Sequence, residues 1–201
     1  MTTMKTSTLP ISLARTGVGP GAALQDAITS HALRRAAAPV LARMLDPERF
    51  ADVIAAEATR HRRFLGGFSL VRVKLDGDAG ELRTVWRAAC TTLARVALEE
   101  TRDTDVIGRV TESELAVLCP QTGAAGAARL ARRIVDGIRE AWAGQTPQPR
   151  ASAGHADTED VRGIEVLMLW DAAGDMLAEA SAAGGGRVGG GRPPAAAAGE
   201  C

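Results

Sequence analysis

The sequence predicts an α/β domain, because long stretches with the apolar spacing of helices alternate with short apolar runs of strand length. The clearest strands lie at residues 106–107 and 115–119, and the polar residues 111–114 between them indicate a hairpin. The chain has 201 residues, of which 46% are hydrophobic and 24% are charged, so it can bury one sizeable core. We therefore expect one domain with appendages at its ends.

The first helix of this domain has a strong start signal. Asp46 can cap the helix, Pro47 suits the first helical position and Glu48 places an acid in the first turn. The helix is expected to run to about Arg63. The basic run at residues 60–63 could attract phosphate, but a solvated helix end whose charge suits the helix dipole is the simpler interpretation.

Apolar spacing defines the remaining elements. Amphipathic patterns predict helices over residues 22–45, 81–101, 123–142 and 164–182. Pro39 is expected to kink the first of these, and Gly174 to interrupt the last. Residues 68–76 alternate between apolar and polar side chains and are expected to form a strand.

Composition restricts the function more than it defines it. Lys+Arg 24 balance Asp+Glu 24, so no global field favours a nucleic acid polymer or an anionic membrane, and any anion site must be local. The three cysteines, Cys90, Cys119 and Cys201, lack metal-binding or disulfide spacing, which indicates a reducing compartment. No run of about 18 apolar residues occurs. We therefore expect a cytoplasmic protein without membrane insertion.

Residues 102–120 resemble the GGDEF domain, the diguanylate cyclase family of bacterial signalling. In that family an R-x-x-D precedes a short strand, a hairpin bearing the signature and an apolar strand that ends near a proline. Arg102 and Asp105 match the first element, and residues 116–120 match the last. Residues 150–156 also match the family's Ser-x-Gly-x-Ala, which predicts a strand there. The resemblance implies a GGDEF/nucleotide cyclase-like fold, with a central, mostly antiparallel sheet flanked by helices.

The resembling domain is expected to span residues 46–188. Residues 1–21 are expected to be a flexible arm, residues 22–45 a leading helix and residues 189–201 a disordered tail rich in Gly, Pro and Ala. In the family such a leading helix often joins a sensor or a second copy, so a homodimer is one expectation. A helix that packs on its own domain is the other.

The residues that carry cyclase chemistry in the family are not matched. The signature reads Thr-Glu-Ser-Glu-Leu at residues 111–115, so its glycines are absent and only Glu114 falls in register. Lys74 stands in place of the first magnesium-binding Asp, where an ammonium repels a metal that needs oxygen ligands, and Asp76 matches the second. The helix that reads guanine is missing, and Ser181 replaces the triphosphate-binding lysine. The resemblance therefore implies no enzyme, no metal and no cofactor.

In the family the R-x-x-D binds the product, cyclic di-GMP, away from the cleft. Arg102 and Asp105 match it, and Arg133 matches a further arginine of the helix after the signature, from the same or a neighbouring protomer. A guanidinium can donate to guanine O6 and N7, and a carboxylate can accept from N1–H and the amine. The sequence thus predicts a cyclic di-GMP receptor that regulates an unidentified protein partner.

Three alternatives remain open. The chain contains four Arg-x-x-Asp strings, and Arg102, Asp105 and Arg133 could be a surface ion-pair cluster without a ligand. The protein could be a pseudoenzyme scaffold that binds protein alone, through residues 22–45 or the tails. Residual cyclase activity is the third and is opposed by Lys74.

Overall fold

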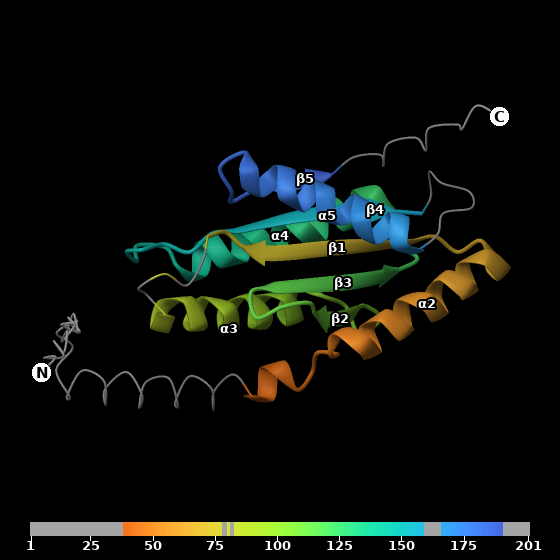
Figure 1. The fold of residues 1–201 in the computed structure, drawn as a ribbon, viewed down its shortest axis with the longest axis horizontal. Helices are drawn as coiled ribbons and strands as arrows, with labels where there is room; N and C mark the ends of the chain where they lie inside the picture. Colours follow the sequence, from red (N-terminus) through yellow and green to blue (C-terminus); the bar gives the residue numbers. More distant parts are fainter. Residues whose placement is uncertain (1–37, 78–79, 81–82, 159–165, 191–201) are drawn as a thin grey trace, which may run out of the picture.

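The structure, a computed structural model, describes residues 38–77, 80, 83–158 and 166–190. It contains a five-stranded sheet in the order β2-β3-β1-β4-β5, shown in Figure 1. In chain order the elements are α2 (Pro47–Phe64), β1 (Phe68–Leu75), α3 (Arg83–Glu100), β2 (Val106–Arg109), β3 (Glu114–Pro120), α4 (Ala124–Ala141), β4 (Ala151–Asp157), α5 (Val166–Ala182) and β5 (Val188–Gly190). Most of these bounds agree with the sequence-based ones to within about two residues.

The sheet is antiparallel except for one pair. Strand β1 lies between β3 and β4 and is antiparallel to both, β2 is antiparallel to β3, and only β4 and β5 run parallel. The predicted hairpin is formed by β2 and β3. The expected α/β class with a mostly antiparallel sheet is thus confirmed.

Helices cover both faces of the sheet (Figure 1). Strand alternation sends Val71, Val73 and Leu75 into a core with α3 and α4. Leu70 points the other way, into a smaller core with α2 and α5. Arg72 and Lys74 share the face of Leu70 by the same alternation, so β1 places two cations on the α2–α5 side.

The start of α2 is as the sequence predicts. Asp46 is the N-cap, and its Oδ1 accepts a hydrogen bond from the Arg49 backbone N–H at 2.9 Å. Pro47 occupies the first helical position, where the absence of an N–H costs nothing. The helix ends at Phe64, one residue beyond the expected position, and Leu65 caps it in a left-handed conformation.

Two helix expectations were wrong. The leading helix does not reach Leu45: its described part ends at Leu41, and Leu45 instead pairs with Gly108 at the edge of the sheet. Helix α5 runs through Gly174 without interruption, and a Cβ at this glycine would strike the Arg72 guanidinium. Residues 22–37 lie outside the described residues.

The predicted start of the disordered tail, residue 189, was too early in the chain. Val188–Gly190 is strand β5, and the Arg187 carbonyl accepts a hydrogen bond from the Ala153 N–H at 3.0 Å. Glycine is required here by close approach, because a Cβ at Gly189 would strike the Met176 carbonyl of α5. The tail from residue 191 and the arm at residues 1–21 lie outside the described residues. No described helix is long and apolar enough to cross a membrane.

Candidate functional site

The Arg-x-x-Asp string at residues 102–105 forms the tight turn between α3 and β2. The Asp105 carboxylate accepts a hydrogen bond from the Arg102 backbone N–H at 2.9 Å, and the Asp105 N–H donates to the Arg102 carbonyl at 3.0 Å. Asp105 is half-buried and Arg102 is exposed. These reciprocal bonds are typical of a side chain closing its own turn, so the i,i+3 spacing here is not a helical ion pair.

Arg133 reaches the same region from α4. Its Nε lies 2.7 Å from Glu100 Oε2 and its Nη2 donates to the Glu100 carbonyl at 2.6 Å, so it caps the last residue of α3. Glu100 stands two residues before Arg102, and Arg133 is 50% exposed. Within the described ranges, no hydrogen bond or ion pair joins Arg133 to Arg102 or Asp105. Arg133 is therefore placed at Glu100, two residues before the turn, and among the described residues it forms no ion-pair cluster with Arg102 and Asp105.

A cavity of about 410 Å³ lies beside this turn, between α2 and the sheet. Arg102 and Arg60 both contribute to its walls, and Leu118 and Pro120 of β3 form an apolar part of its surface. The other lining residues are Val53, Glu57, Thr104, Val106 and Gln121. Its volume falls in the range of small-molecule sites.

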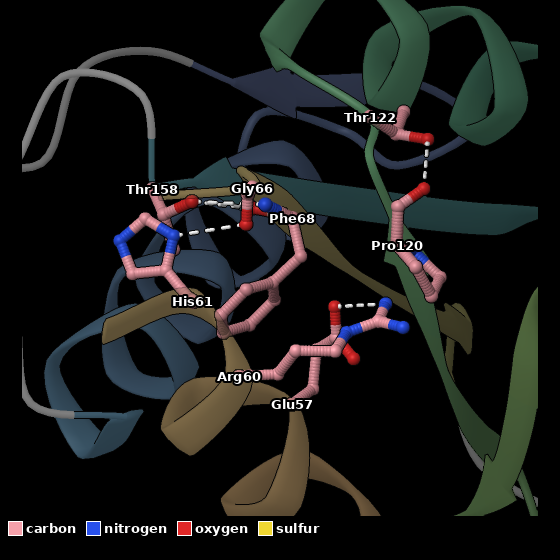
Figure 2. A network of polar contacts seen from close by, with 8 residues as sticks. All are labelled: Glu57, Arg60, His61, Gly66, Phe68, Pro120, Thr122 and Thr158. Atoms are coloured by element: carbon pink, nitrogen blue, oxygen red, sulfur yellow. Dashed lines mark hydrogen bonds and ion pairs between the residues drawn. The ribbon is translucent and has the colours of Figure 1, made fainter. Parts of the chain in front are cut away.

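Arg60 was missed as a cavity residue, although it belongs to the basic run at the end of α2. Its Nη2 lies 2.7 Å from Glu57 Oε1, and Figure 2 shows its guanidinium extending toward Pro120. The position could have been found only by knowing that α2 crosses the end of β3. Arg102 differs from it, because no hydrogen bond or ion pair of its guanidinium occurs among the described residues.

Internal contacts occupy the other region that the resemblance singles out. Glu114 pairs with Arg72, whose Nη2 and Nε lie 2.6 and 2.8 Å from Glu114 Oε1. Both side chains are nearly buried, 16% and 10% exposed, and the guanidinium stacks on Trp170 at 4.4 Å from the ring centroid. Lys74 is the strand partner of Glu114 and is exposed. The one signature acid in register therefore already has a cation.

Asp76 is also used by the fold itself. Its carboxylate accepts hydrogen bonds from Ser152 Oγ at 3.0 Å, from Ser181 Oγ at 2.8 Å and from the Gly186 N–H at 2.8 Å. It thereby ties the end of β1 to β4 and to the turn after α5. Among the residues that the structure describes, no group of three or more His, Cys, Asp or Glu side chains could hold a metal ion.

The buried titratable groups do not add a reactive centre. Burial raises the pKa of Cys119 to about 12 and that of Cys90 to about 11, so both thiols stay protonated near neutral pH. Burial also lowers the pKa of His155 on β4, against an opposing effect of Asp157. The Nδ1 atom of His155 is buried without a hydrogen-bond partner.

Comparisons with known proteins define the fold. No protein-family model and no curated protein sequence matches the chain. The coiled coil and GGDEF domain of DgcB from Caulobacter crescentus, solved with c-di-GMP, aligns with a TM-score of 0.66 and 14% identity, covering 85% of this chain and 98% of that one. The active GGEEF domain of a diguanylate cyclase from Vibrio cholerae aligns with a TM-score of 0.65 and 18% identity, covering 77% of this chain and 99% of that one.

A third structure extends the comparison to a regulated enzyme. Diguanylate cyclase SiaD from Pseudomonas aeruginosa, in complex with its activator SiaC, aligns with a TM-score of 0.64 and 18% identity, covering 84% of this chain and 70% of that one. The chain therefore has a GGDEF-like fold.

Proposed function

We propose that this protein is a catalytically inactive GGDEF-like domain that binds cyclic di-GMP at the turn between α3 and β2 and thereby regulates a protein partner. The observation that carries the proposal is the state of Arg102. Its guanidinium has no partner among the described residues and lines a cavity of about 410 Å³. An exposed, unpaired guanidinium beside a cavity is available to a guanine base or a phosphate.

The neighbouring groups supply the remaining chemistry. Asp105 uses Oδ2 to close the turn, and a carboxylate has further lone pairs that can accept from the guanine N1–H and amine. Arg133 can exchange the half-exposed Glu100 carboxylate for a ligand phosphate at low cost, since exposed ion pairs contribute little to stability. Arg60 adds a second cation to the cavity wall.

The proposed loss of activity rests on the two acids near the hairpin. A magnesium ion would need carboxylate oxygens, yet Glu114 is held by Arg72 and Asp76 by two serines and a backbone N–H. The exposed ammonium of Lys74 would repel the ion further. Incubation with GTP and magnesium is expected to give no cyclic di-GMP, and formation of product would contradict this part of the proposal.

Calorimetric titration of the full chain with cyclic di-GMP tests the receptor function. The wild type is expected to give binding heat, and Arg102→Ala to lose it with an unchanged unfolding midpoint, because an exposed unpaired side chain contributes little to stability. Arg49→Ala, in another Arg-x-x-Asp string, is the matched control and should keep the heat. Absence of wild-type heat at ligand concentrations on the order of tens of micromolar would reject the receptor function.

A protein-binding scaffold is a second candidate, favoured by an apolar groove of about 430 Å³ between α2 and α5. Phe50, Ile54, Val110 and Trp170 contribute to it, and Leu167 at its rim is 69% exposed. Self-association that ignores cyclic di-GMP and disappears in Leu167→Glu, which places a charge in this groove, would support this candidate. Self-association that responds to cyclic di-GMP would support the receptor instead.

A further inference from the structure

The end of α2 exposes large apolar side chains next to arginines. Phe64 is 74% exposed and Leu65 is 84% exposed, directly after Arg62 and Arg63, which are exposed as well. We call Arg60, Arg62, Arg63, Phe64 and Leu65 the cationic tip. No other described residues expose two large apolar side chains that adjoin a run of cations.

The backbone of the cationic tip is held in an unfavourable conformation. Leu65 has φ 54° and ψ 21°, in the left-handed region that a branched side chain adopts only at a cost, whereas glycine adopts it readily. Its N–H donates to the His61 carbonyl at 2.8 Å. His61 Nδ1 in turn donates to the Gly66 carbonyl at 3.0 Å, as Figure 2 shows. The fold therefore fixes a leucine outward where glycine would fit better, and such an outlier points to a function.

Further apolar side chains lie toward the same end of the molecule. Leu167 and Met168, in the first turn of α5, are 69% and 42% exposed, and with Phe64 and Leu65 they complete the exposed large hydrophobic residues of the described chain. Ser181 near the end of α5 bonds to Asp76 just after β1. The first turn of α5 therefore lies toward the end where β1 begins, which directly follows the cationic tip (Figure 1).

The charges of the cationic tip are available to a partner. Arg60 is paired with Glu57, but neither Arg62 nor Arg63 forms an ion pair with any described residue. Three cations beside two protruding apolar side chains match a surface that is negatively charged at its outer layer and apolar beneath it. A lipid bilayer with anionic headgroups has this composition, and the small hollow of about 200 Å³ that Arg60 and Phe64 help to line does not include Leu65, the most exposed apolar side chain of the tip.

We propose that the cationic tip docks this protein on an anionic lipid surface, with Phe64 and Leu65 entering the boundary between headgroups and acyl chains and the arginines contacting lipid phosphates. This inference goes beyond the proposed function and does not depend on it. The zero net charge of the chain is compatible with such binding, since the attraction comes from one local patch rather than from the net charge.

Co-sedimentation of the full chain with vesicles tests the proposal. Binding is expected to phosphatidylcholine vesicles that contain phosphatidylserine and not to phosphatidylcholine alone, and it should weaken as salt is raised. Arg62→Glu with Arg63→Glu should lower the partition coefficient by at least about 25-fold, from about five-fold per cation lost. Leu65→Gly should also weaken binding while leaving the unfolding midpoint unchanged or higher, because it relieves the left-handed leucine.

The matched control is Arg83→Glu with Arg187→Glu, which makes the same charge change on exposed residues away from the cationic tip that likewise form no ion pair with any described residue. This control should bind the anionic vesicles like the wild type. The proposal is overturned if the wild type does not sediment with anionic vesicles, or if the control loses as much binding as the tip variant. A further outcome would also overturn it: the wild type binds RNA but not vesicles, and the tip variant does not bind RNA. The tip would then be a nucleic-acid surface.

Discussion

Arg72 on β1 and Arg102 in the turn after α3 carry the same guanidinium group in different surroundings. Arg72 is 16% exposed, bonded to Glu114 and stacked on Trp170, so its donors and its flat face are already used. Arg102 is exposed, and its acid partner in sequence, Asp105, bonds to its backbone rather than to its side chain. The comparison shows that an arginine next to an acid either forms a structural pair or keeps an unpaired guanidinium, according to burial and turn geometry.

The largest effect is expected on the Arg72 side. Arg72→Ala leaves the Glu114 carboxylate nearly buried without a cation, which should lower the free energy of unfolding by about 3 kcal/mol. Urea denaturation measures this loss. Arg72→Met with Glu114→Leu removes both charges and should recover most of the stability. An equal loss in single and double variants would show that packing on Trp170, and not the ion pair, stabilises this region.

A smaller effect on the free energy of unfolding is expected from a change of pH, and it arises from His155 rather than from either arginine. Burial lowers the pKa of His155 below its usual value, so between the folded and unfolded pKa values the unfolded chain binds more protons. The free energy of unfolding should therefore fall as pH drops from about 6.5 toward the folded pKa, by about 1.4 kcal/mol per unit of pKa difference. Urea denaturation across this range measures the slope, and His155→Leu should reduce it. An unchanged slope in that variant would assign the effect to another group.

The smallest effect on stability is expected at the open turn. Glu100→Ala removes the carboxylate partner of Arg133, a half-exposed pair, and leaves the bond to the backbone carbonyl, so it should cost no more than about 1 kcal/mol. In the proposed binding mode Glu100 would compete with a ligand phosphate for Arg133, so the same variant should tighten cyclic di-GMP binding several-fold in calorimetry. Unchanged affinity alongside loss of binding in Arg102→Ala would place the ligand away from Arg133.

Local signals made much of the fold predictable. The Asp46-Pro47 start of α2 and the polar break between β2 and β3 depend on residues close in sequence, and both elements form as expected. Strand β5 was missed because a run rich in glycine has low strand propensity, and only the backbone of α5 explains why glycine is needed there. The uninterrupted course of α5 was missed because a single glycine lowers helix propensity without having to end a helix, and the side chain that Gly174 faces comes from β1, far away in sequence.

The candidate site was predictable only in part. Arg102, Asp105 and Arg133 follow from position relative to the hairpin, but the hydrogen-bond partner of Arg133 is Glu100 at the end of α3, 33 residues away in sequence. The Arg72–Glu114 pair joins residues 42 apart on neighbouring strands. Neither contact leaves a trace in a one-dimensional pattern, because the first depends on how α4 packs against α3 and the second on the register of the sheet.

The attachment of Leu45 to the sheet has a mechanical consequence. Its N–H donates to the Ile107 carbonyl and its carbonyl accepts from the Arg109 N–H, both at 2.9 Å. The segment before α2 is therefore hydrogen-bonded to the outer edge of β2, which is only four residues long. That strand begins one residue after Asp105. The turn that holds Arg102 and the segment before α2 are therefore attached to one short strand, at its start and along its outer edge.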